Sequence, residues 1–304
     1  MAKTKKSQTT AKTEEKQSIK QERYSVSKAA DNTINIKIVI PWHEVEKVRK
    51  EVSNELVKEV QVPGFRKGKA PRDIAEVKLS KEKVNEEVLK KVLTKEYVEA
   101  VKANNIQPIL NPKIHIEAFD EGTNLEFMAE TCEEPVVELN SYKDEVKKVN
   151  AASKIIVPPS ASSGQANQEP KKISLEEILE TVLKVTKITI PKVLAEQEAN
   201  RLLSQLLDEL KTIGVSLDQF LASRGKTGDE IRAEYMEKAE KDLKLEFLLR
   251  KIADSEKITV EEKDIQEALA SITDEKQKKE LMANPYFLAA IIRQQKTIDF
   301  LSKI

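Results

Sequence analysis

The chain has 304 residues, which is room for two domains of ordinary size, and its 34% of charged residues favours helices with solvated faces. The 52 lysines and arginines balance 52 aspartates and glutamates, so no overall charge excess indicates general coating of nucleic acid or of an anionic membrane. One cysteine and two histidines exclude a disulfide framework within the chain and leave too few ligands for a structural zinc site.

The first segment, residues 1–23, has seven lysines and arginines against three glutamates and almost no large apolar side chain. Such a segment cannot offset the entropy lost on ordering, so we expect a disordered basic tail. No apolar run follows its lysines, which excludes a signal peptide, and no stretch of the chain has the roughly 18 apolar residues that a membrane helix needs. We therefore expect a soluble, cytoplasmic protein.

Residues 24–150 have the pattern of one α+β domain. Apolar residues alternate over Thr33–Ile40, which predicts a strand with one buried face. Pro41 can open a helix, and apolar residues then recur every three or four positions up to Val60. The chain continues with a second helix and a hairpin of two strands, over residues 84–101, 113–118 and 124–131.

The second half of the chain begins with a linker and is then helical. Residues 151–170 hold prolines, serines and a glycine without periodicity, which predicts a flexible linker. Residues 171–304 are expected to form an all-α domain. Its expected helices cover 191–213, 217–221, 229–253, a helix capped by Thr259 and Glu262, and a last helix from Asn284.

Three enzyme patterns fail when their spacing is checked. Gly64–Lys69 has one residue too few for a nucleotide-binding P-loop, and Ala70 replaces the hydroxyl residue that binds Mg²⁺. His43 and Glu44 begin like a zinc-protease motif, but Lys47 stands where the second histidine is required. Cys132 is expected to be an ordinary buried thiol and not half of a Cys-His pair. We therefore expect no catalytic residue, no metal site and no cofactor.

One segment, Gly64–Pro71, has the features of a presented loop. Four cations fall within seven residues without an anion between them, namely Arg66, Lys67, Lys69 and Arg72. Phe65 beside Arg66 is a pairing typical of interface hot spots, and the cations suit a phosphate backbone or an acidic protein surface. Alternatively, the loop only connects two helices and Phe65 folds back into the core. Residue chemistry alone leaves both possibilities open.

The motif Gly64-Phe65-Arg66-x-Gly68-x-x-Pro71, between two amphipathic helices of an α+β domain, resembles the signature of bacterial trigger factors. These are chaperones that receive nascent chains at the ribosome exit tunnel. The resemblance extends to the alternating strand at 33–40, to Val62-Pro63 before the motif and to the segment 133–139 after the hairpin. The region from Ile190 onward is similar to the family's C-terminal, SurA-like chaperone domain. The resemblance thus covers roughly residues 24–304.

This resemblance implies an ATP-independent chaperone whose partners are the large ribosomal subunit near the tunnel exit, through protein and rRNA, and unfolded or nascent polypeptides. It assigns the ribosome-contact role to Phe65, Arg66 and Lys67, with Lys69 as a further cation. Gly64, Gly68 and Pro71 would shape the loop. Candidate client contacts lie in the last helix, where apolar residues occupy all sides of the helix and not one stripe. Alternatively, these residues only pack in the core of the domain. They are Phe287, Leu288, Ile291 and Ile292.

The chain departs from the family in one respect. Most trigger factors carry an FKBP-like prolyl isomerase domain between the other two domains, and only the linker 151–170 stands there in this chain. We therefore expect a form without that domain and without isomerase activity. Two alternatives remain, a prolyl isomerase with a cryptic site and an RNA-binding protein that uses the basic loop. A weak homodimer away from the ribosome is also left open.

Overall fold

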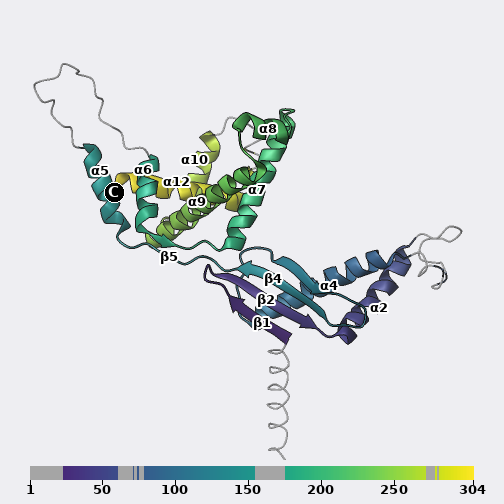
Figure 1. The fold of residues 1–304 in the computed structure, drawn as a ribbon. Coiled ribbons are helices and arrows are strands. Elements are labelled where there is room, and N and C mark those ends of the chain that lie inside the picture. Colours follow the sequence, from purple (N-terminus) through teal and green to yellow (C-terminus); the bar gives the residue numbers. More distant parts are fainter. Residues whose placement is uncertain are drawn as a thin grey trace, which may run out of the picture. The chain divides into compact units, whose positions relative to one another are not determined.

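The computed structural model describes residues 23–60, 71, 74, 79–154, 175–271, 278 and 281–304. The chain divides into two compact units, which are seen in Figure 1. The first contains the chain up to Glu134 together with Pro191–Leu194, and the second contains Pro135–Ile190 and Ala195–Ile304. None of the helices in these described ranges has the length and apolar character that crossing a membrane requires.

The first unit contains a four-stranded antiparallel sheet. Its strands are β1 (Tyr24–Lys28), β2 (Thr33–Ile40), β3 (Lys113–Ala118) and β4 (Leu125–Cys132), in the spatial order β1-β2-β4-β3. The isoleucines of β2 pair in register with β4 and are almost completely buried, as alternation predicts for a sheet with one covered face. The predicted strand at 33–40 and the predicted hairpin are therefore confirmed.

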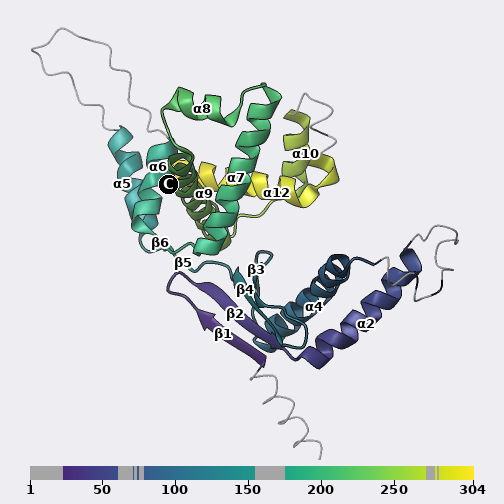
Figure 2. The same ribbon diagram turned by 45° about the vertical axis from the view of Figure 1, so that its right-hand side comes forward.

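Two helices cover that buried face. They are α2 (Trp42–Glu59), which follows Pro41, and α4 (Lys81–Ala103), which follows Ser80. Their apolar side chains share one core with the sheet, and the sequence predicted both helices correctly. Figure 2 shows the two helices and the sheet as one layered unit. The fully buried members of this core include Ile36, Ile38, Val45, Val52, Val88, Leu125 and Phe127.

The second unit is helical apart from one short strand pair. Val137 and Glu138 of β5 (Val137–Glu138) pair with Ile188 and Lys187 of β6 (Lys187–Ile188). One core cluster joins buried side chains of four helices, and another lies between α7 and α9. The helices are α5 (Tyr142–Lys154), α6 (Leu175–Val185), α7 (Lys192–Thr212), α8 (Leu217–Arg224), α9 (Gly228–Ser255), α10 (Glu262–Ser271) and α12 (Pro285–Lys303).

Helix starts in this unit depend on local side-chain caps. Capping boxes form at Ser216 with Gln219 before α8 and at Thr227 with Glu230 before α9. The box predicted at Thr259 and Glu262 is wrong. Instead α10 begins at Glu262, and the backbone N–H of Glu261 donates to Asp264 Oδ2 at 2.7 Å, because an aspartate in the first turn reaches that N–H directly.

The two units divide between Glu134 and Pro135, earlier than the boundary expected at residue 150. The reason is α5, a helix that the sequence analysis did not predict. Its Tyr142 and Val146 are buried in the same cluster as Ile178 and Val182 of α6. Residues 135–150 therefore pack with the helical unit.

Candidate functional site

The basic loop expected to bind a partner falls mostly outside the described residues. Gly64, Phe65, Arg66, Lys67, Gly68 and Lys69 all lie in the range 61–70, for which no placement is described. Pro71 is described and is exposed. The expected tail and linker lie largely outside as well, at 1–22 and 155–174.

The helices on either side of this loop are fixed against each other. Val52 of α2 and Val88 of α4 are buried in the same core. Arg49 Nη2 donates to Asn85 Oδ1 at 3.0 Å, and Lys91 of α4 forms an ion pair with Glu55 of α2. Apolar packing and polar contacts therefore hold α2 and α4 together, the two helices that precede and follow residues 60–80 in the sequence.

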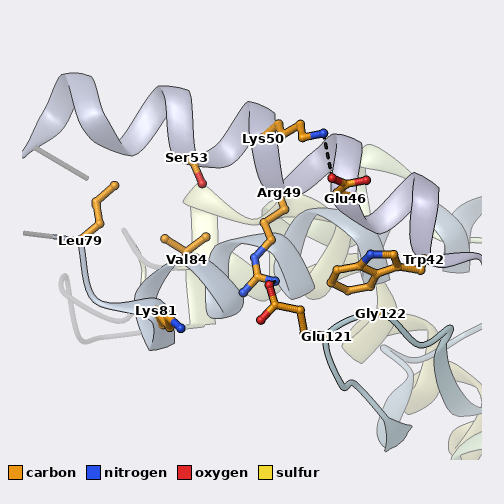
Figure 3. A pocket seen from close by; sticks show the side chains of 10 residues that line it. All are labelled: Trp42, Glu46, Arg49, Lys50, Ser53, Leu79, Lys81, Val84, Glu121 and Gly122. Carbon is orange, nitrogen blue, oxygen red and sulfur yellow. Dashed lines mark hydrogen bonds and ion pairs between the residues drawn. The ribbon is translucent and has the colours of Figure 1, made fainter. Parts of the chain in front are cut away.

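A pocket of about 550 Å³ opens beside this helix pair. Arg49 points from α2 into the pocket, beside the Trp42 ring and toward Glu121 on the turn between β3 and β4 (Figure 3). Leu79 and Lys81 line it where the chain enters α4. The remaining lining residues are Glu46, Lys50, Ser53, Val84 and Gly122.

The guanidinium of Arg49 is the central group of this pocket. It lies 5.9 Å from the centroid of the Trp42 ring, Nη1 contacts Glu121 Oε1 at 3.3 Å, and its side chain is only 22% exposed. The Glu121 side chain is 74% exposed. Lys50 pairs with Glu46 at 2.8 Å, and that hydrogen bond lowers the pKa of Glu46. No described residue forms an ion pair with Lys81. The arrangement can receive a planar or anionic group.

The predicted client-contact residues of α12 differ in how far they are exposed. Phe287 and Ile291 are 56% and 44% exposed, one helical turn apart. Leu288 is buried at 4% exposure, and Ile292 is partly buried. Leu288 therefore packs inside the unit, as the alternative interpretation held for it.

Two further apolar residues extend this exposed surface, and the sequence analysis did not single them out. Met282 is 59% exposed and Tyr286 is 88% exposed. Both stand close to Pro285, where α12 begins. The apolar residues on both sides of that proline are the sequence feature that points to them. We call Met282, Tyr286, Phe287 and Ile291 the α12 apolar patch.

The single cysteine has the environment of an inert thiol. Cys132 is completely buried in β4, and burial raises the pKa of its thiol to about 11, with smaller contributions from Asp31 and Glu133. The strand register places His115 opposite Met128, so it is not the neighbour of Cys132. Within the described ranges no three histidine, cysteine, aspartate or glutamate side chains gather to hold a metal ion.

Comparison with known protein families covers most of the chain. The family model described as bacterial trigger factor protein (TF) matches residues 23–155. The model of the C-terminus of bacterial trigger factor protein matches residues 162–303. Only residues 156–161 lie between the two matched ranges.

Individual relatives match a smaller part. The trigger factor of Natranaerobius thermophilus is 35% identical over 118 residues, which are 38% of this chain and 26% of the relative. That of Bacillus mycoides is 40% identical over 106 residues, which are 33% of this chain and 25% of the relative. The aligned stretches thus span about a quarter of the length of these curated relatives.

A solved structure has the same fold over almost all of its length. It comes from work on promiscuous substrate recognition in the folding and assembly activities of the trigger factor chaperone. Its TM-score is 0.58 at 15% identity, over 92% of this chain and 99% of that one. The α+β unit, the helical unit and both family matches lead to one conclusion: the chain belongs to the bacterial trigger factor family.

Proposed function

We propose that this protein is an ATP-independent chaperone that docks on the large ribosomal subunit at the tunnel exit and shields nascent polypeptides while they fold. The observation that carries the proposal is the match of both the N-terminal and the C-terminal trigger factor models over residues 23–155 and 162–303.

The docking element of the proposal is the loop 64–71. It joins α2 to the segment that leads into α4, so the two packed helices support both of its ends. Arg66, Lys67 and Lys69 suit rRNA phosphates or acidic protein side chains, and Phe65 adds an apolar anchor. Gly64, Gly68 and Pro71 shape the loop.

The client surface of the proposal is the α12 apolar patch. Contiguous exposed apolar side chains mark interaction sites. The four side chains of the α12 apolar patch lie near one helix start and are between 44% and 88% exposed. Contacts of this kind are weak and tolerant of sequence, which lets a client leave without ATP. Phe287 and Ile291 are the proposed contacts, with Met282 and Tyr286 beside them.

The proposal also includes the properties that follow from the short connection between the matched ranges. Residues 156–161 are too few for an isomerase domain, since domains seldom fall below about 50 residues, and we propose that the protein has no prolyl isomerase activity. It would act in the cytoplasm. Away from the ribosome, exposed apolar surface such as the α12 apolar patch favours a weak homodimer.

The decisive experiment is co-sedimentation with purified ribosomes at near-physiological salt. We compare the wild type with the triple variant Phe65→Ala, Arg66→Ala, Lys67→Ala. The matched control is Lys211→Ala with Arg232→Ala, which removes two exposed cations from the helical unit. We expect the control to pellet like the wild type and the loop variant to remain in the supernatant, because the loop supplies both the anchor and the charge of the contact.

Circular dichroism of each variant verifies that the fold is retained. Equal pelleting of the loop variant and the wild type would contradict docking through this loop. Failure of the wild type itself to pellet would contradict the ribosome as the partner.

A further inference from the structure

The pocket beside α2 and α4 combines two planar side chains. The Trp42 indole and the Arg49 guanidinium lie 5.9 Å apart, and Arg49 is held in place by Asn85 at 3.0 Å. Aromatic rings and guanidinium planes are the groups on which proteins stack unpaired nucleobases. A flat heterocycle can therefore stack in this pocket.

Charge in the pocket favours an anion. Three cations, Arg49, Lys50 and Lys81, line it together with two carboxylates. Glu46 is engaged by Lys50 within the same helix, while Glu121 sits on an exposed turn and contacts Arg49 at 3.3 Å. Glu121 therefore occupies the position that an incoming anion would take, and its 74% exposure allows it to turn away.

The size and position of the pocket agree with a nucleotide. Its volume of about 550 Å³ lies within the range of small-molecule sites. Leu79 and Lys81 follow, in sequence, the segment that carries the cations Arg66, Lys67, Lys69 and Arg72. A strand of RNA that meets the basic loop thus finds a second cationic site on the same pair of helices.

We propose that this pocket binds one nucleotide of single-stranded ribosomal RNA. The base stacks against the Trp42–Arg49 pair, and the phosphate replaces Glu121 on Arg49 with Lys81 beside it. The inference rests on the proposed function, since the ribosome supplies the RNA. It adds to the basic loop a contact that discriminates unpaired RNA from a purely acidic surface.

The chain provides its own probe, because Trp42 is its only tryptophan. We titrate the full-length protein with a single-stranded adenosine decamer of RNA at low salt and follow tryptophan fluorescence. We expect saturable quenching, because a base stacked on the indole quenches its emission, and an affinity that falls linearly with salt on logarithmic axes.

Three variants localise the binding. Arg49→Gln removes the planar cation and should lower the affinity for the RNA decamer by about tenfold. Glu121→Gln removes the competing carboxylate and should raise the affinity for the RNA decamer roughly threefold. The matched control is Glu117→Gln on β3, whose partner is Lys37 at 2.8 Å and which is outside the pocket; its affinity should equal that of the wild type.

Several outcomes would overturn the proposal. Absence of quenching by RNA, or quenching that Arg49→Gln leaves unchanged, would show that no base stacks in this pocket. Quenching by a glutamate decamer but not by RNA would identify an acidic protein contact instead. If Arg49→Gln failed to fold, tighter binding by Glu121→Gln beside unchanged binding by Glu117→Gln would still support the pocket, and equal affinities of these two variants would contradict it.

The two proposals can fail separately. Ribosome pelleting that survives the loop substitutions would contradict docking through the loop, while decamer binding by the same variant would leave the pocket intact. Conversely, a loop variant that loses ribosomes beside a wild type that shows no quenching would keep the proposed function and remove the nucleotide site.

Discussion

Glu256 connects α5 to the end of α9 through two side chains. The Tyr142 hydroxyl donates to Glu256 Oε1 at 2.9 Å, and Lys143 Nζ donates to Oε2 at 2.8 Å. The hydrogen bond from Lys143 lowers the pKa of Glu256; partial burial opposes this, and the Tyr142 bond adds to it. The charged carboxylate is therefore part of what holds α5 in place.

We predict that Glu256→Gln destabilises the protein at neutral pH by about 0.5–1 kcal/mol, the range of partly exposed ion pairs. A lowered folded-state pKa gives stability that is complete above the ordinary value of 4.5 and is lost as the pH falls below it. Urea unfolding should thus give a lower free energy of unfolding for Glu256→Gln than for the wild type at neutral pH. This difference should disappear at about pH 3.

The control for this prediction is Glu267→Gln. Glu267 pairs with Lys263 at 3.6 Å, and both side chains are largely exposed, so its replacement should leave stability unchanged at both pH values. A deficit of Glu256→Gln that persisted or grew in acid would mean that packing, and not charge, produced it.

At the scale of elements, the start of α9 depends on one threonine. The Thr227 hydroxyl accepts from the backbone N–H of Glu230 at 3.3 Å, and the Glu230 carboxylate accepts from the N–H of Thr227 at 2.7 Å. α9 contributes buried residues to the two clusters described above for its unit, and Ile231 near its start belongs to one of them, so fraying at this end reaches that core.

We predict that Thr227→Ala lowers the free energy of unfolding by about 1 kcal/mol, measured by urea denaturation. Thr212→Ala is the matched control, because the Thr212 hydroxyl donates to the Asp208 carbonyl within α7 and caps no free N–H. Equal losses in the two variants would indicate that the capping box contributes nothing beyond the loss of a side chain.

Elements with a regular pattern could be predicted from sequence, and those without one could not. β2 and the β3–β4 hairpin alternate because one face is covered, and α2 and α4 repeat every three or four residues for the same reason. β5 and β6 have two residues each and are separated by about 50 positions in the sequence, so no local sequence pattern predicts them. In the described part of α5, the packed face is marked by just three apolar residues, Tyr142, Val146 and Val149.

The candidate site shows the same division. The basic loop could be predicted from sequence because its residues are contiguous, and it stays a prediction because residues 61–70 lie outside the described ranges. The pocket was not found, because Trp42, Lys81 and Glu121 come from three elements that only the fold brings together. In α12 the sequence pattern could not separate exposed Phe287 and Ile291 from buried Leu288, since apolar residues surround the helix start.

At the scale of the whole molecule, the two proposed activities belong to different units. The basic loop departs from α2 in the first unit, and the α12 apolar patch lies in the second. Changes to one contact surface should leave the other activity intact, because each surface belongs to a unit that has its own core.

We predict that Phe287→Ser with Ile291→Ser reduces suppression of client aggregation several-fold, measured by light scattering, while ribosome pelleting stays at the wild-type level. The loop variant should behave in the opposite way. Ile213→Ser, which changes another side chain that is 69% exposed at the end of α7, controls for a general loss of apolar surface. An effect equal to that of the α12 changes would argue against a localised client surface.

The packing of α5 against α6 has a consequence for how this architecture can change by insertion or deletion. Residues 155–174 connect two helices whose buried side chains already meet in one cluster, so the two ends of that connection are held by contacts that do not depend on its length. Where the elements on both sides of a connection are held by their own packing, an inserted domain costs the host fold little. Insertion or removal of a domain at this point would therefore leave the packing of α5 against α6 unchanged.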